Sequence, residues 1–247
     1  MNPAPAGMAA AAIISPKQSL DTAMKPSRIW LLLFLVEFVL AAPLIGQTNS
    51  AVKFESEIAA FAASDKTNPP PTDAVLFVGS SSIRRWTTLA RDFADTPVIN
   101  RGFGGAQISD VLYFFDKLIP PYKPKKIVFY CGGNDINAGK SPKEVMRDFI
   151  LFHQRVQRLY QNLPVIVISV GPSPSRWAQV EKVRVLNAAL EAYAKGTPTV
   201  TYVDVFSLML GPDGQPRPDI YVEDRLHLNP EGYKIWIAAL KDLVAGR

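Results

Sequence analysis

The stretch Ala74-Val-Leu-Phe-Val-Gly-Ser-Ser-Ser-Ile-Arg-Arg-Trp86 decides the fold, because it joins an apolar run to a turn of small residues and a helical start. Its first five residues are all apolar, as in a strand that is buried on both faces of a sheet. Strands of that kind belong to parallel sheets, whose neighbouring strands are joined by crossover connections. The stretch therefore predicts an α/β fold with three adjacent serines at a strand–helix turn.

Four further apolar runs repeat this arrangement along the chain. They cover residues 97–100, 127–131, 165–170 and 200–205, and the first three of them end in turn residues. Ser141-Pro142 and Asn229-Pro230 open two helical patterns, since serine and asparagine cap helices and proline suits the first helical position. The alternation predicts a five-stranded parallel sheet between two layers of helices, with ligands bound at the carboxyl ends of the strands.

Polar residues suited to acyl transfer follow these strands. Ser81 lies at a helix start, where backbone N–H groups point outward. Asp224 and His227 precede the last helix, and their spacing lets the carboxylate orient the imidazole so that Nε2 can take a hydroxyl proton. Segments 100–105 and 132–135 supply glycine N–H groups and an asparagine amide for a tetrahedral oxyanion. Each segment alone is ordinary turn chemistry, but four of them at one sheet edge favour a serine hydrolase.

Together these segments resemble the sequence blocks of the SGNH/GDSL family of serine esterases and lipases, in the family's order. Segment 100–105 is particularly similar to the platelet-activating-factor acetylhydrolase-like branch of that family. The resemblance spans residues 75–236. The matching blocks are Gly79-Ser-Ser81 for the first, Asn100-Arg-Gly-Phe-Gly-Gly105 for the second, Gly132-x-Asn134-Asp135 for the third and Asp224-x-x-His227-Leu for the fifth.

The resemblance implies a flavodoxin-like three-layer α/β/α sandwich and an esterase that needs no cofactor or metal. It implies that Ser81 is the nucleophile, His227 the base and Asp224 the residue that orients it. It further implies that the oxyanion is bound by the Ser81 N–H, Gly105 and Asn134. The expected substrate is a small-molecule ester of a lipid or carbohydrate with a small acyl group such as acetyl.

Some assignments stay open at this point. The residue before the nucleophile is Ser80 where the family has aspartate, so spacing alone leaves Ser82 as an alternative nucleophile. Asp204, near the end of the fifth strand, is an alternative acid for His227. Two other function classes also compete: a catalytically silent carbohydrate- or lipid-binding module on the same fold, and a metal-dependent hydrolase that uses Asp135 and Asp224.

Other residues have an ordinary structural explanation. The chain has only two histidines, which disfavours a histidine zinc site. His153 lies on the apolar side of its helix, so we expect it to be a packed, hydrogen-bonded core residue. Cys131 is the single cysteine and lies in an apolar run, so we expect it to be buried. The glycine-rich segment that begins at Gly102 has Gln107 where a dinucleotide-binding fingerprint needs its third glycine, so a dinucleotide site is disfavoured. Trp86, Phe103 and Tyr113 either line an acyl pocket or pack in the core or on the surface.

The N-terminal part has the pattern of a targeting segment. Lys25 and Arg28 precede the apolar run 29–44, which is short for a membrane span and contains Glu37. We expect residues 1–46 to be a signal peptide or N-terminal anchor with an unstructured leader, and the protein to be exported to the periplasm or beyond. Residues 47–71 are expected to form a linker and a covering helix around 52–63, followed by the hydrolase domain at 72–247. The net charge of +5 is scattered, so no nucleic-acid partner is expected, and a membrane partner only through an uncleaved N-terminus.

Overall fold

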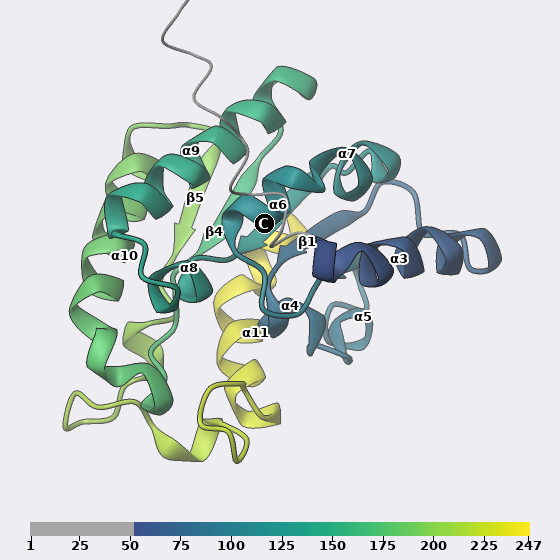
Figure 1. The fold of residues 1–247 in the computed structure, drawn as a ribbon. Coiled ribbons are helices and arrows are strands. Elements are labelled where there is room, and N and C mark those ends of the chain that lie inside the picture. Colours follow the sequence, from purple (N-terminus) through teal and green to yellow (C-terminus); the bar gives the residue numbers. More distant parts are fainter. Residues whose placement is uncertain (1–51) are drawn as a thin grey trace, which may run out of the picture. The chain divides into compact units, whose positions relative to one another are not determined.

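A five-stranded, all-parallel sheet forms the centre of the protein, whose computed structural model describes residues 52–247 (Figure 1). The expected signal or anchor segment lies outside the described residues. The sheet order is β2-β1-β3-β4-β5, the flavodoxin-like order, so the predicted fold class is confirmed. The strands are β1 (Val75–Gly79), β2 (Val98–Gly102), β3 (Lys126–Tyr130), β4 (Val165–Ile168) and β5 (Val200–Val203).

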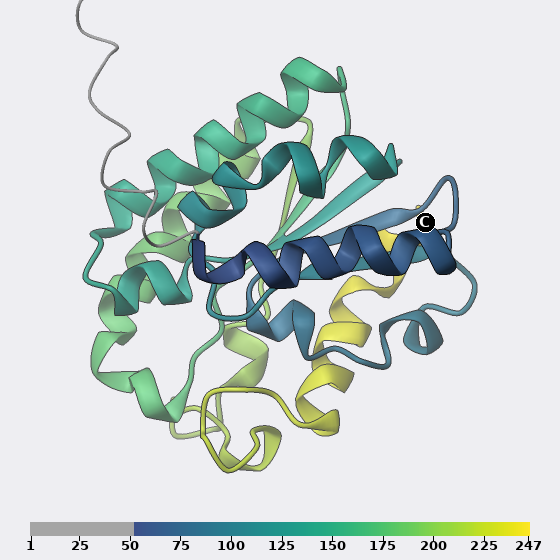
Figure 2. The same cartoon turned by 45° about the vertical axis from the view of Figure 1, so that its right-hand side comes forward.

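Helices cover both faces of this sheet, as the two views show (Figures 1 and 2). None of the helices in residues 52–247 is both long and apolar enough to span a membrane. One layer comprises α3 (Glu55–Thr67), α6 (Ile108–Tyr113), α7 (Phe115–Leu118), α9 (Pro142–Leu159) and α10 (Val180–Lys195). The other comprises α4 (Ser81–Arg84), α5 (Leu89–Asp92) and α11 (Pro230–Ala245), and the short α8 (Gly133–Asn137) follows β3.

The strands separate two hydrophobic cores, because successive side chains of a strand point to opposite faces. Leu76 and Val78 of β1 pack with the layer that contains α3, α6, α9 and α10. Val75 and Phe77 pack with the layer that contains α4, α5 and α11. Burial on both faces explains why the strands are continuous apolar runs in the sequence.

The predicted helix starts of α9 and α11 are confirmed in atomic detail. The Ser141 side chain accepts a hydrogen bond from the Glu144 N–H, and the Glu144 carboxylate accepts one from the Ser141 N–H, forming a capping box. The Asn229 side chain accepts from the backbone N–H groups of Glu231 and Gly232. The Asn229 cap fixes the end of the segment that carries His227, which lies two residues before Asn229.

Gly79 makes the turn from β1 to α4 possible. Its φ of +146° is unfavourable for residues with a side chain, and an added Cβ would lie 1.9 Å from the Tyr130 carbonyl oxygen. Close contact with β3 therefore requires glycine here, and the Ser80 N–H donates to the same oxygen at 3.0 Å. β1 pairs with β2 on one side and β3 on the other, so the turns after β1 and β3 flank the point where strand order reverses. Ligands bind at such points in open α/β sheets.

Candidate active site

Ser81, His227 and Asp224 form a continuous hydrogen-bonded chain. Ser81 begins α4, and its Oγ lies 2.8 Å from His227 Nε2. His227 Nδ1 lies 2.6 Å from Asp224 Oδ2. When Nδ1–H donates to the carboxylate, Nε2 has a lone pair with which to accept the Ser81 hydroxyl hydrogen. The chain joins residues 146 positions apart in the sequence, in an order that suits proton transfer from the hydroxyl.

The turn that carries Asp224 and His227 holds the carboxylate in its ionised form. Asp224 Oδ1 accepts hydrogen bonds from the backbone N–H groups of Leu226 and His227, at 2.9 and 2.8 Å. Partial burial raises the pKa of Asp224, but the hydrogen bonds from the His227 N–H, the His227 ring and the Leu226 N–H outweigh it and lower the pKa to about 2. The carboxylate therefore stays charged beside the imidazole across the neutral and mildly acidic range.

In the described part of the chain, the two alternative residues make their hydrogen bonds to groups other than the His227 ring. The Ser82 carbonyl accepts a hydrogen bond from the Tyr233 hydroxyl at 2.8 Å, and Ser82 lies close to Tyr130 of β3. Asp204 follows β5, and its Oδ1 accepts from the Ser207 N–H at 3.1 Å. Ser81 and Asp224 are thus the serine and the aspartate in contact with His227.

Asn134 has both ends of its amide fixed by neighbours. Its Nδ2 donates to the Ala106 carbonyl at 3.0 Å, and its Oδ1 accepts from Arg176 Nη1 at 3.1 Å. An acceptor on one side and a donor on the other determine which end of the amide is nitrogen. Asn134 lines the same cavity as Ser81 and His227, so its second N–H is available for a group bound there.

The structure gives less direct support for Gly105 as an oxyanion donor than for Asn134. It lies in the exposed loop between β2 and α6 with a φ of +73°, and an added Cβ would meet no atom within 4 Å. It is not among the residues that line the cavity beside Ser81, so its role as an oxyanion donor stays a prediction.

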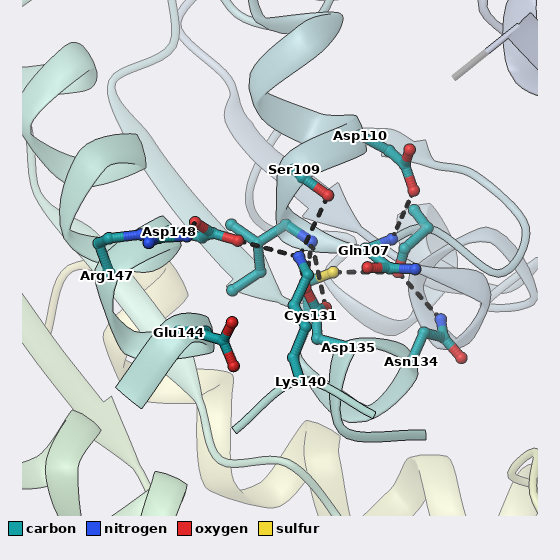
Figure 3. Close-up of polar contacts among 12 residues, drawn as sticks. Gln107, Ser109, Asp110, Cys131, Asn134, Asp135, Lys140, Glu144, Arg147 and Asp148 are labelled. Carbon is teal, nitrogen blue, oxygen red and sulfur yellow. Dashed lines mark hydrogen bonds and ion pairs between the residues drawn. The ribbon is translucent and has the colours of Figure 1, made fainter. Parts of the chain in front are cut away.

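A buried ion-pair network ties α8, which carries Asn134, to the start of α6, which follows the loop with Gly105 (Figure 3). Asp135 is fully buried and accepts from the Ile108 N–H at 3.2 Å and from Lys140 Nζ at 2.8 Å. Lys140 Nζ also contacts Asp148 Oδ2 at 2.9 Å and Ser109 Oγ at 3.2 Å. Burial raises the pKa of Asp135, because the charged form loses water. The network fixes the spacing of the segments that follow β2 and β3.

A cavity opens beside Ser81 toward β4 and β5. Its walls come from segments that the sequence analysis did not connect with the site: the 3-10 helix Pro174–Gln179, the start of α10 and residues after β5. A run of Pro and Ser after β4 was the only local signal for this wall. Residues of the wall beyond Ser81, Asn134 and His227 include Arg176, Trp177, Val180, Phe206, Met209 and Tyr221.

The aromatic residues considered for an acyl pocket pack elsewhere. Trp86 and Phe103 are buried in the two separate cores, and Tyr113 is exposed on α6. None of the three lines the cavity beside Ser81. Their side chains instead make edge-on or stacked contacts with other rings, such as Trp86 on Tyr233 with centroids 5.0 Å apart. The packing interpretation is therefore correct for all three.

His153 and Cys131 have the structural surroundings expected of core residues. The His153 ring nitrogens each lie 2.9 Å from a hydroxyl oxygen, those of Tyr193 and Thr199, and burial lowers the His153 pKa. Cys131 is buried beside the Ala106 carbonyl, and burial raises the pKa of its thiol. Within residues 52–247, no cluster of three or more His, Cys, Asp or Glu side chains is arranged to hold a metal ion.

The comparisons with known proteins agree with this fold and with the sequence blocks. The model of the GDSL-like Lipase/Acylhydrolase family matches residues 72–235. A Streptococcus pneumonia protein, provisionally described as a platelet activating factor, is 23% identical with a TM-score of 0.69, over 87% of this chain and 99% of its own. A GDSL-like lipase from Bacteroides thetaiotaomicron is 23% identical with a TM-score of 0.67, over 76% of this chain and 97% of its own.

A more distant structure, a carbohydrate esterase family 3 protein from Talaromyces cellulolyticus, is 14% identical with a TM-score of 0.56, over 70% of this chain and 99% of its own. No curated protein matches the chain. At these identities the solved structures establish a shared fold, whereas the family model covers the segments that carry Ser81, Gly105, Asn134, Asp224 and His227.

Proposed function

We propose that this chain, which belongs to the GDSL-like lipase/acylhydrolase family, is a serine esterase that hydrolyses a small acyl ester through an acyl-enzyme intermediate. The observation that carries the proposal is the His227 ring, which lies between Asp224 Oδ2 and Ser81 Oγ at 2.6 and 2.8 Å. That geometry supplies a nucleophile, a base and a group that orients the base.

The chemistry follows from these contacts. Ser81 Oγ attacks the ester carbonyl carbon while His227 Nε2 takes the hydroxyl proton, and a tetrahedral oxyanion forms. The oxyanion accepts hydrogen bonds from the Ser81 N–H, the Asn134 amide and the Gly105 N–H. The intermediate collapses as His227 returns the proton to the leaving alcohol oxygen. A water molecule, activated by His227, then releases the acid from Ser81 in the same two steps.

The cavity favours a small acyl group. Its enclosed part is small, about 50 Å³ where one water molecule needs roughly 10–15 Å³, and the rest of the cavity opens to solvent. A group of a few non-hydrogen atoms, such as acetyl on a lipid or carbohydrate alcohol, therefore fits. As partners we propose this small-molecule ester and no nucleic acid, with a membrane only through the N-terminal segment.

Replacement of each candidate serine tests the proposal. With 4-nitrophenyl acetate, Ser81→Ala is expected to lower kcat by on the order of a million-fold, since the nucleophile is lost. Ser82→Ala is the matched control and should keep most of the turnover, because Ser82 contacts Tyr130 and Tyr233 instead of His227. Circular dichroism should show both variants folded.

Two results would contradict the proposal. If Ser82→Ala is inactive while Ser81→Ala turns over normally, the nucleophile is the neighbouring serine. If the wild-type protein shows only background hydrolysis across a panel of acyl esters, the chain is a catalytically silent binding module on the hydrolase fold.

A further inference from the structure

Arg176 places a cation in the wall of the proposed esterase cavity. It lies in the 3-10 helix Pro174–Gln179 and is half-buried, and burial lowers the pKa of its guanidinium. Among residues 52–247, its one side-chain hydrogen bond goes to the neutral Asn134 Oδ1, at 3.1 Å. A guanidinium carries five N–H donors, so this contact leaves most of them without an acceptor in the described part of the chain.

The surroundings of Arg176 hold no compensating charge. Within residues 52–247, no carboxylate oxygen lies within 4.0 Å of the guanidinium. Among residues 52–247, those that line the cavity include no Asp, Glu or Lys. Arg176 and His227 are the two basic side chains of this lining. This contrasts with Arg101, whose more deeply buried side chain is paired with Asp65 at 2.5 Å. A half-buried cation without a counter-ion is costly unless a ligand supplies the opposite charge.

We propose that Arg176 is a specificity-determining residue that binds an anionic group of the substrate, so that the enzyme prefers esters that carry a carboxylate or phosphate. The inference rests on the proposed esterase function and adds a substrate class to it. Arginine suits this role, because its planar guanidinium makes two parallel hydrogen bonds to such anions. The anion could belong to the acyl group or to the alcohol, since both parts of an ester extend from the carbonyl bound at Ser81.

A second role of Arg176 makes a different prediction. Its hydrogen bond to Asn134 orients an oxyanion donor, and a purely orienting role would affect every ester to the same extent. The ratio of kcat/KM between a charged ester and a neutral ester of the same shape removes this shared effect. The ratio is therefore the readout that separates substrate binding from orientation of Asn134.

Two matched substrate pairs measure the ratio and locate the anion. Monoethyl succinate and ethyl succinamate differ only by a carboxylate or a carboxamide on the acyl group. 4-Acetoxybenzoate and 4-acetoxybenzamide differ in the same way on the alcohol. The wild-type enzyme is expected to prefer the carboxylate member of at least one pair by roughly tenfold to a hundredfold in kcat/KM, as for a hydrogen-bonded charge pair.

Three variants identify Arg176 as the cause. Arg176→Gln keeps an N–H donor for Asn134 but removes the charge, so the ratio should fall to near one. Arg176→Lys keeps the charge and should retain part of the preference. Arg158→Gln removes an exposed arginine of α9 and should leave the ratio unchanged.

Binding to the Ser81→Ala variant provides a readout that does not need turnover. Calorimetry should show tighter binding of the preferred carboxylate ester than of its carboxamide, and Ser81→Ala/Arg176→Gln should lose the difference. Equal ratios for wild type and Arg176→Gln, together with equal binding of both esters, would overturn the proposal while leaving the esterase function intact. Loss of Ser81-dependent hydrolysis of all four esters, with the binding preference retained, would instead count against the esterase function alone.

Discussion

Asp224 combines its proposed catalytic position with a charge that persists into acid. Replacement by asparagine removes the acceptor that selects the Nδ1–H tautomer of His227, so kcat should fall on the order of ten-thousand-fold. The folded-state pKa of about 2 lies below the ordinary 3.8, so the carboxylate stabilises the fold above 3.8 and loses that contribution as pH falls through about 2. Urea unfolding of wild type and Asp224→Asn between these pH values should therefore give a stability difference that shrinks toward acid. A difference that is constant over that range would contradict this account.

Asn134 offers a kinetic signature that separates an oxyanion donor from a binding contact. Asn134→Ala removes the hydrogen bond that we propose forms with the transition state, so kcat should fall by roughly a hundred- to a thousand-fold with little change in KM. Steady-state kinetics with 4-nitrophenyl acetate measures both constants. A variant impaired in KM alone would show that the amide binds the ground-state ester, and would remove Asn134 from the oxyanion site.

At the scale of elements, Lys140 in the short loop between α8 and α9 connects three helices. Its Nζ contacts Ser109 of α6, Asp135 of α8 and Asp148 of α9. Lys140→Met would leave Asp135 buried without its cation, which should lower the free energy of unfolding by roughly 3–5 kcal/mol. The flexible methionine side chain keeps a similar length, so the loss of charge dominates the effect. Urea denaturation followed by circular dichroism measures this change.

Lys143→Met is the matched control for this charge. Lys143 is an exposed residue in the first turn of α9, so its replacement should change stability by no more than about 0.5 kcal/mol. Equal denaturation midpoints for the Lys140 and Lys143 variants would show that the Asp135 charge is neutralised in another way, for example by protonation of its carboxyl group.

For the whole molecule, the targeting segment makes a prediction of its own. The basic residues before the apolar run 29–44 lead us to propose that the mature protein begins between Pro43 and Ala51 and lies outside the cytoplasm. N-terminal sequencing of the protein from fractionated cells measures this directly. Recovery of a membrane-bound species that retains residues 29–42 would favour an uncleaved anchor instead.

Local sequence determined the sheet and the approximate positions of its turns. Buried parallel strands must be apolar on both faces, so each strand could be recognised from a single continuous run such as Ala74–Val78. The family assignment and the ester hydrolase class, both confirmed by the family model, followed from short blocks whose members lie within a few residues of one another. The Asp224–His227 contact was accessible for the same reason, since one turn brings both side chains together.

Only the tertiary structure decided which serine meets His227 and what surrounds it. Spacing could not separate Ser81 from Ser82, because the choice depends on how α4 packs on β1 and β2 and on a loop 146 residues away. The position of Arg176 beside Asn134 likewise arises from a segment after β4 folding over the end of β3, a contact across 42 residues. The burial of Trp86 and Phe103 depended on which helix covers which face of the sheet. Such contacts are set by the packing of whole layers, which no local pattern of residues encodes.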